Sequence, residues 1–397
     1  MVLGQELATN HSIGQLEVVS TFNGAMPTGV TVSDNSRIFV NFPKWGDDVT
    51  YTVAEVKDGK TVPYPEAGMN HYSQGDHQAE KLVSVQSVVV DPTGRRLWIL
   101  DTGSIGFGPV QEGGPKLMAV DLATNQVIKK IIFPPNVALP TSYVNDVRFD
   151  LHRGAEGMAF ITDSTSNGPN GIIVVDLASG KSWRRLEDHP STKPDSSFVA
   201  VTEGEILEIR LPGQRAQRFA VGSDGIAISA DGKTLYYCPL TSRHLYSVSV
   251  DALADRSPPD SAVAATVKDL GEKGGAGNGL ESDAEGRVYF SDYEHNAIRR
   301  RNARGEIETL VQVLASSGRI RCLWRRTDIF TSARIKLSAR RYFTTAVICA
   351  RSPTFFSESK STEGEFKTNA LTPNSDLPGH SDEHFLVDLD AVLPAKT

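Results

Sequence analysis

Residues 224–238 read DGIAISADGKTLYYC, and this stretch decides the fold. A short alternating strand runs into an Asp-Gly turn at Asp231 and Gly232, and a second strand rich in aromatic residues follows. Glycine and asparagine accept the positive φ that tight turns need, so alternation interrupted by such residues predicts a β-hairpin.

The same pattern recurs along the chain in five copies, spaced 54 to 79 residues apart. The copies occupy residues 27–41, 86–101, 145–163, 224–238 and 278–292. Most are followed by a second hairpin, at residues 117–133, 172–186 and 297–311. Each unit therefore has about four antiparallel strands, and such units repeated radially make a β-propeller, whose closed ring removes exposed sheet edges. In the longest interval, residues 189–194 predict a loop insertion.

Composition is compatible with a large buried core. The chain has 397 residues, 39% hydrophobic and 22% charged, with a net charge of −7, which excludes collagen-like and highly charged disordered classes. No apolar run approaches the ~20 residues of a membrane helix, and the first twenty residues contain no export signal. The three cysteines have no metal-binding spacing, and Cys238 is expected to be a buried small hydrophobe.

The segment after residue 312 departs from the repeat. Residues 319–351 carry nine basic residues and one acid, without alternation or Asp-Gly turns. A nucleic-acid patch is the less favoured interpretation, and no nucleic-acid partner is expected. Read one nucleotide earlier with degenerate codons, residues 317–335 can be written as LWPDTLSVAPDGHLYFSAN, which is a sixth copy of the repeat.

The sequence therefore predicts an all-β, six-bladed β-propeller with an incomplete or disrupted last blade. Residues 16–312 are expected to form blades one to five and a closing N-terminal strand. Residues 313–361 are interpreted as a frame-shifted remnant of blade six, and residues 362–397 as a disordered acidic tail. On this hypothesis the open ring has exposed edges and low stability after Gln312, and residues 16–22 lack a partner strand.

Several motifs in the same order resemble the yellow and major royal jelly protein family. They are Met26-Pro27-Thr28-Gly29-Val30, Arg37 to Trp45, Ser84 to Ser87, Leu97 to Gly103, Tyr143 to Asp146, Tyr236 to Leu240 and Leu245 to Val248. The resemblance implies a six-bladed, mostly secreted protein, and hence an extracellular location although no signal peptide is visible. Some such proteins bind biogenic amines or other small hydrophobic ligands, and some convert dopachrome. The resemblance implies a small aromatic or hydrophobic ligand of amine, catechol or sterol type, and no cofactor.

Polar residues that begin the innermost strands are the candidate site. Propeller symmetry turns these side chains toward the central channel, where convergent polar groups suggest binding. The expected ligand-binding residues are Gln86, Asn145, Asp224 and Asn278, with Asp224 and Asp146 as candidate catalytic acids or bases. The alternative is that all five hydrogen-bond loop backbone and cap strands. Asp101, Asp163 and Asp292, which end the second strands, are expected to form turns.

Two other functions stay open. The 224–238 and 278–292 motifs also resemble calcium-dependent lactonases of the regucalcin type, in which oxygens of Asn145, Asp224 and Asn278 would hold Ca²⁺ or Mg²⁺. Residues 24–29 contain no Glu to complete that ligand set. A non-enzymatic structural or storage protein is the second alternative.

Some further residues carry weaker signals. Trp45 and Tyr72 either wall an aromatic ligand or, as we favour, pack. His71, His77 and His189 lie in loops beside no Ser or Cys motif, so they define no triad. The sequence decides neither whether the protein is an enzyme nor its oligomeric state.

Overall fold

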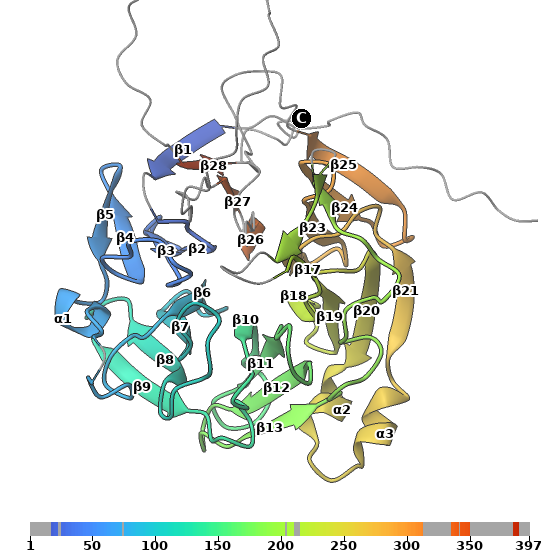
Figure 1. The fold of residues 1–397 in the computed structure, drawn as a ribbon, viewed down its shortest axis with the longest axis horizontal. Coiled ribbons are helices and arrows are strands. Elements are labelled where there is room, and N and C mark those ends of the chain that lie inside the picture. Colours follow the sequence, from blue (N-terminus) through green and yellow to red (C-terminus); the bar gives the residue numbers. More distant parts are fainter. Residues whose placement is uncertain are drawn as a thin grey trace, which may run out of the picture.

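The computed structural model describes residues 17–22, 25–73, 75–202, 205–209, 215–312, 335–340, 342–349 and 384–388. Residues 29–312 form five four-stranded antiparallel sheets that fan around a common axis (Figure 1). The first blade contains β2 (Gly29–Val32), β3 (Ile38–Asn41), β4 (Val53–Lys57) and β5 (Lys60–Pro63), and the second contains β6 (Val85–Val90), β7 (Arg96–Thr102), β8 (Pro115–Asp121) and β9 (Val127–Ile132). The third contains β10 (Val144–Asp150), β11 (Met158–Asp163), β12 (Gly171–Asp176) and β13 (Ser182–Arg185), and the fourth contains β18 (Ser223–Ile228), β19 (Thr234–Pro239), β20 (His244–Ser249) and β21 (Lys268–Glu272). The fifth contains β22 (Leu280–Ser282), β23 (Val288–Asp292), β24 (Ala297–Arg301) and β25 (Ile307–Gln312). The prediction of an all-β propeller is confirmed for these five blades.

The deciding hairpin forms as predicted. Strand β18 pairs with β19, and Gly232 in the turn between them has a φ of +68°, which a β-branched residue could not adopt without strain. Gly94 has a φ of +70° at the equivalent turn of the second sheet. The repeated Asp-Gly spacing therefore reports a repeated turn conformation.

Each sheet buries both faces, because a neighbouring blade packs on either side. Trp98 of the second blade and Phe149 of the third stack with ring centroids 5.1 Å apart in one such interface. In β11, Ile161 packs toward the second blade and Phe160 toward the fourth. Every residue of β10 is buried, including the polar Asn145, Asp146, Arg148 and Asp150, so both faces of this inner strand lie inside the protein.

Strands from the two ends of the chain form another four-stranded sheet. Its order is β1 (Glu17–Phe22), β28 (His384–Asp388), β27 (Tyr342–Cys349), β26 (Ile335–Arg340), and β26 lies beside the inner strands β2 and β22. The expectation that residues 16–22 lack a partner is wrong, because β1 pairs antiparallel with β28. Strand β28 also lies in the segment expected to be a tail, whereas residues 313–334 and 350–383 fall outside the described residues, so the frame-shift hypothesis stays a prediction.

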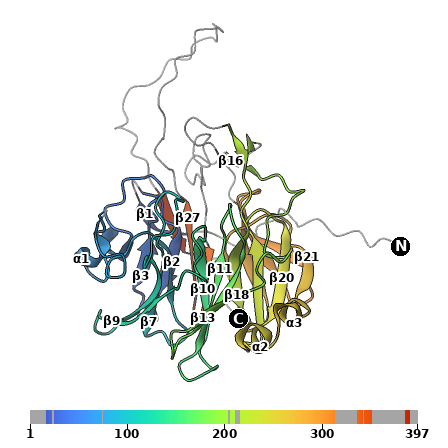
Figure 2. The same ribbon diagram turned by 60° about the horizontal axis from the view of Figure 1, so that its bottom comes forward.

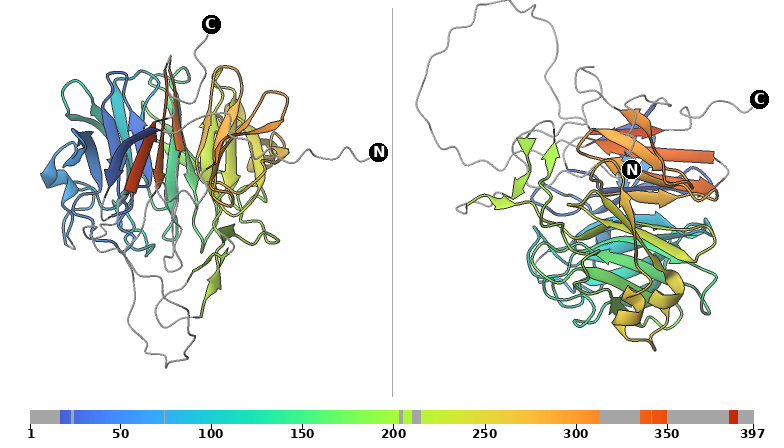
Figure 3. Two further views of the ribbon diagram at one scale, coloured as in Figure 1. Left: turned by 90° about the horizontal axis from the view of Figure 1, so that it is seen from above. Right: turned by 90° about the vertical axis from the view of Figure 1, so that its right-hand side faces the viewer.

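Connections between the blades vary most in the third interval. Residues 189–194, the predicted insertion, form a loop with turns. Two short ribbons that the sequence did not indicate follow this loop: β14 (Val201–Thr202) pairs with β15 (Glu205–Ile206), and β16 (Glu208–Ile209) pairs with β17 (Gln217–Arg218). Figures 2 and 3 show these ribbons standing out from one end of the propeller. Short helices α1 (Ala67–Asn70), α2 (Val250–Ala254) and α3 (Asp260–Ala264) lie at the outer side of the blades. Within the described residues, no helix has the length and apolar character needed to cross a membrane.

The aspartates that end second strands form turns, as predicted. Each carboxylate accepts hydrogen bonds from backbone N–H groups two or three residues further on. Asp101 accepts from Gly103, Asp163 accepts from Thr165, and Asp292 accepts from Glu294 and His295. Each aspartate also pairs with a cation from a later strand of its own blade. The cations are Lys116, Arg184 and Arg299, at N–O distances of 2.8, 2.8 and 2.6 Å.

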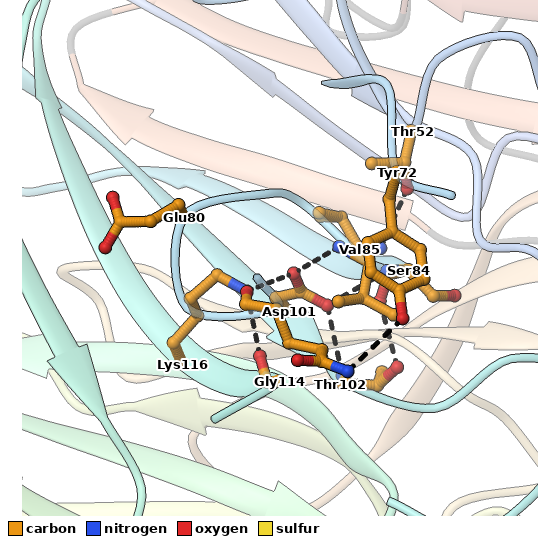
Figure 4. Close-up of polar contacts among 12 residues, drawn as sticks. Thr52, Tyr72, Glu80, Ser84, Val85, Asp101, Thr102, Gly114 and Lys116 are labelled. Carbon is orange, nitrogen blue, oxygen red and sulfur yellow. Dashed lines mark hydrogen bonds and ion pairs between the residues drawn. The ribbon is translucent and has the colours of Figure 1, made fainter. Parts of the chain in front are cut away.

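The Asp101–Lys116 pair is completely buried and fully hydrogen-bonded (Figure 4). Asp101 accepts the backbone N–H groups of Val83 and Ser84, in the loop that leads into β6, at 2.7 and 3.0 Å. Lys116 Nζ also donates to the carbonyl oxygens of Gln78 and Gly114, both at 2.9 Å. Since a buried charge needs such compensation, this pair holds the start of the inner strand in place.

We predict that Lys116→Met destabilises the protein by about 3–5 kcal/mol, because it leaves the Asp101 carboxylate buried without its cation. Lys130→Met is the matched control: Lys130 pairs with Glu80, whose side chain is 69% exposed, and its loss should cost less than about 1 kcal/mol. Chemical denaturation of the two variants measures the difference. Equal losses would show that the buried pair does not stabilise the blade.

Candidate functional site

Four predicted site residues lie at irregularities in their inner strands. The pairing register shifts between Val85 and Ser87, between Val144 and Val147, and between Ser223 and Gly225. The shifts leave Gln86, Asn145, Asp146 and Asp224 outside the ladder pairs, and Asp146 is described separately below. A β-bulge turns its extra residue away from the regular alternation, so these bulges re-aim the side chains of Gln86, Asn145 and Asp224.

The re-aimed side chains meet across three blades. Gln86 Nε2 donates to Asn145 Oδ1 at 3.0 Å, and Asn145 Nδ2 donates to Asp224 Oδ2. Their exposed fractions are 3%, 1% and 6%. The structure therefore joins Gln86, Asn145 and Asp224 in one hydrogen-bonded line at the end of the axis where the inner strands begin, here called the entry end.

Asn278 lies next to this line but is bonded differently. Its carbonyl oxygen would lie 3.5 Å from a Cβ added to Gly225, so it adjoins Asp224. Its Oδ1 accepts from Ser291 Oγ at 2.5 Å, while its Nδ2 is buried without a hydrogen-bond partner among the described residues. We call Gln86, Asn145, Asp224 and Asn278 the axial cluster.

Asp146, the other predicted catalytic residue, lies one position deeper and belongs to a separate network. Its Oδ1 accepts from Ser87 Oγ at 2.5 Å and its Oδ2 from Arg148 at 3.0 Å. Arg148 reaches the fifth blade, where it donates to Leu280 O at 2.7 Å and pairs with Glu281 at 3.5 Å. Burial by itself would lower the pKa of Arg148. The carboxylates of Asp146 and Glu281 raise it by a larger amount, so the pKa of Arg148 lies above its ordinary value. Asp146 thus serves to hold a charged bridge between blades.

An aromatic cluster extends the polar line toward solvent. Tyr143 OH donates to Gln86 Oε1 at 2.8 Å and accepts from Trp45 Nε1 at 2.6 Å. The Phe107 ring lies between them, 5.2 Å from the Trp45 ring and 5.2 Å from the Tyr143 ring. Trp45 and Phe107 are half-buried and Tyr143 is buried. Solvent exposure therefore decreases from Trp45 and Phe107 through Tyr143 to the axial cluster.

The aromatic cluster was only partly visible in the sequence. Trp45 was considered for a ligand wall with packing favoured, and it does both pack and hydrogen-bond at the entry end. Tyr72 is 8% exposed and packs with Lys44 elsewhere. Tyr143 and Phe107 were missed. The position of Tyr143 two residues before Asn145 was a usable signal, whereas nothing in the loop sequence marks Phe107.

A divalent cation at the axial cluster would have to compete with hydrogen bonds inside the protein. Asn145 Oδ1 accepts from Gln86, and Asn278 Oδ1 accepts from Ser291. Across the described ranges, no group of three His, Cys, Asp or Glu side chains is arranged to hold a metal ion. Asp224 would therefore be the single acidic ligand of the predicted set, whereas Ca²⁺ sites combine several oxygen ligands.

The remaining candidates have local roles. Cys238 is buried, which raises its thiol pKa, and its Sγ contacts Gly277 O, in keeping with the predicted packing role. His189 Nδ1 lies 2.7 Å from Ser191 Oγ, which in turn lies 2.6 Å from Tyr237 OH. Since Ser191 is 2% exposed, this contact ties the loop to β19.

Comparison with known proteins decides the family. The family model described as major royal jelly protein matches residues 83–320, more than half of the chain. The chain belongs to the major royal jelly protein family.

Curated relatives of this royal jelly family chain include Protein yellow of Drosophila erecta and of Drosophila melanogaster. Each is 28% identical over 245 residues, which covers 59% of this chain and 42% of the relative. The matched part thus spans about two-fifths of their length. The family resemblance inferred from the motifs is confirmed.

A solved structure titled as a gluconolactonase from Xanthomonas campestris is similar at 10% identity. The superposition covers 95% of this chain and 88% of the gluconolactonase chain, with a TM-score of 0.45. At that score the similarity carries no information on activity.

We predict that Tyr143→Phe lowers the free energy of unfolding by about 1–3 kcal/mol, because Gln86 Oε1 and Trp45 Nε1 both lose their partner. Tyr51→Phe is the control: the half-buried Tyr51 hydroxyl bonds Thr61 alone among the described residues, and water can replace this hydroxyl. Urea denaturation compares the two. A Tyr143→Phe variant as stable as Tyr51→Phe would contradict a structural role for the bridge.

Proposed function

We propose that this protein binds a small aromatic amine at the entry end of a six-bladed propeller. The amine meets the axial cluster and the ring meets the aromatic cluster. The sixth blade in this proposal is the sheet β1-β28-β27-β26, which lies between the first and fifth blades. An extracellular location is part of the proposal and rests on the family resemblance.

The observation that carries the proposal is the unbroken line from Trp45 through Tyr143, Gln86 and Asn145 to Asp224. Exposed ring surface lies at one end of this line and a buried carboxylate at the other. A ligand with an aromatic ring and a cationic amine has the same two-ended chemistry. Ring stacking and cation–π contact favour the first end, and a charge-assisted hydrogen bond favours the second.

Asn278 supplies the matching donor. A buried amide N–H without a partner costs free energy, and a ligand oxygen that accepts from Nδ2 would recover it. Asn278 adjoins Asp224, so a phenolic or catechol oxygen can accept from one while an N–H or O–H donates to the other. This pairing supports aromatic ligands that carry several hydroxyl or amine groups over largely apolar ones such as sterols.

Dopachrome conversion is a narrower form of the same proposal. A tautomerisation needs a carboxylate that can take up and return a proton, and Asp224 rather than Asp146 is suited to it. Both oxygens of Asp146 are engaged, one by Ser87 Oγ and one by the Arg148 guanidinium. Loss of dopachrome turnover in Asp224→Asn, with ligand binding retained at high concentration, would support this form.

The other two functions have less support. A cation-dependent lactonase needs oxygens that Asn145 and Asn278 use for hydrogen bonds within the protein. A storage function would not explain why the half-buried ring of Trp45 is connected through hydrogen bonds to the buried carboxylate of Asp224. If neither tyramine nor 4-ethylphenol binds, the storage function is favoured.

We predict that isothermal titration detects binding of tyramine and weaker binding of 4-ethylphenol, which lacks the amine. Asp224→Asn should weaken tyramine binding about 10- to 100-fold, because a hydrogen bond to a charged group contributes about 1.5–3 kcal/mol. The same variant should weaken 4-ethylphenol binding much less, because a neutral O–H gains less from a carboxylate than an ammonium group does. EDTA should change neither affinity.

Asp231→Asn is the matched control. Asp231 lies in the β18–β19 turn at the opposite end of the same strand, where it bonds Ser229 and Lys233. Tyramine binding that is equally weakened by both substitutions, or by neither, would contradict the proposal. Loss of binding in the presence of EDTA would favour the lactonase alternative.

A further inference from the structure

The described residues contain three Asn-Gly pairs: Asn167-Gly168, Asn170-Gly171 and Asn278-Gly279. In such a pair the backbone nitrogen after the asparagine can attack the side-chain amide carbon, because glycine has no Cβ to shield that nitrogen. A further pair, Asn23-Gly24, falls outside the described residues. Since the three described pairs have the same covalent chemistry, only their surroundings can make them react differently.

The first pair lies in the loop that connects β11 to β12, and its reacting groups are not engaged. The Asn167 side chain is exposed, and the Asn167 backbone N–H donates to Thr165 Oγ1 at 3.2 Å. Within the described ranges, neither the side-chain amide of Asn167 nor the backbone N–H of Gly168 forms a hydrogen bond. The nitrogen and the amide carbon can therefore meet without breaking a hydrogen bond of either group.

Asn170, three residues further along the same loop, is held in place. Its side chain is 2% exposed, and its Nδ2 donates to Thr165 O at 2.7 Å and to Asp163 O at 3.2 Å. The Asn170 Cγ also packs against Gly222, where an added Cβ would lie 2.1 Å away. Attack on this carbon requires the loop to open first.

The third pair belongs to the axial cluster and is held at the other reacting group. Asn278 is 1% exposed, and the backbone N–H of Gly279 donates to Ser291 Oγ at 3.1 Å. Ser291 Oγ in turn donates to Asn278 Oδ1 at 2.5 Å. One serine thus holds both the nitrogen and the amide of this pair.

Packing also requires a glycine after Asn167. A Cβ added to Gly168 would lie 2.1 Å from Thr141 Oγ1 and 2.9 Å from Thr141 Cβ. Thr141 belongs to the loop that precedes β10, so the two loops of the third blade touch at this glycine. The residue that makes the exposed asparagine reactive is therefore one that the fold needs.

We propose that Asn167 is a site of spontaneous deamidation. The Gly168 nitrogen gives up its proton and attacks Asn167 Cγ, the bond from Cγ to Nδ2 breaks, and ammonia leaves. Water then opens the resulting succinimide at either of its carbonyl carbons, which leaves aspartate or isoaspartate at residue 167. A neutral side chain is replaced by a carboxylate, without an enzyme or a bound ligand.

The modification changes the entry end of the propeller. Strand β11 ends at Asp163, whose carboxylate accepts the backbone N–H of Tyr143 at 2.8 Å, so the Asn167 loop lies beside the start of β10. Deamidation adds a negative charge to this loop. Isoaspartate also inserts a methylene group into the main chain between Thr165 and Asn170, which both form hydrogen bonds in the loop.

Deamidation of the full-length protein, folded or unfolded in urea at mildly alkaline pH, tests the proposal. In the folded protein Asn167 should react at least about tenfold faster than Asn170 and Asn278, because those two react only when the surrounding structure opens. In urea the three rates should become similar. Peptide mass spectrometry measures the rates, with fragmentation to separate Asn167 from Asn170, which share the tryptic peptide 154–181. Equal rates in the folded protein would overturn the proposal.

Two controls test the role of Gly168. Asn136 is also exposed but precedes Val137, whose backbone N–H donates to Pro134 O at 2.8 Å, so Asn136 should stay unmodified when Asn167 reacts. Asn167→Gln, which would need a larger ring, should abolish modification at residue 167 and leave the urea unfolding midpoint unchanged. The succinimide predicts a mixture of aspartate and isoaspartate. Aspartate alone would refute attack by the Gly168 nitrogen, because direct hydrolysis gives that product only.

Discussion

Among the described strands no backbone ladder joins one blade to the next, so side chains connect the inner strands of the propeller. Thr31 Oγ1 of the first blade accepts Val90 N of the second at 3.0 Å, and Thr162 Oγ1 of the third donates to Asp224 O of the fourth at 2.7 Å. Arg148 extends from the third blade to Leu280 O in the fifth. Polar residues are therefore required near the axis, where apolar packing alone would leave strand-end backbone groups unpaired.

This constraint explains why structural and functional interpretations of the axial cluster overlap. Gln86, Asn145 and Asp224 hydrogen-bond one another across three blades and are almost completely buried. The same arrangement places a carboxylate at the end where the loops carrying Trp45 and Phe107 meet, beside the Asn278 amide N–H that has no partner among the described residues. A polar group that stabilises the propeller can thus also bind a ligand. Asp146 is paired with Arg148, so its role is structural.

The buried lysines of the described residues are satisfied in different ways. Asp101 and Lys116 neutralise each other in the interior and hold the start of β6 in place. Lys273 is equally buried and donates to Ser242 O at 2.9 Å, and burial lowers its pKa. A buried ammonium therefore needs either a carboxylate or carbonyl oxygens close by.

The sequence by itself determined the five repeats, their hairpin turns and the family, because alternation and Asp-Gly spacing are local properties that reappear in every blade. It also placed Gln86, Asn145, Asp224 and Asn278 at strand starts. Only the tertiary structure decided that the bulges at the first three aim them at one another, that Asp146 pairs with Arg148, and that β1 pairs with β28. Phe107 and Tyr143 join the site through loops of different blades, and such contacts depend on how the ring brings distant segments together, which no local pattern encodes.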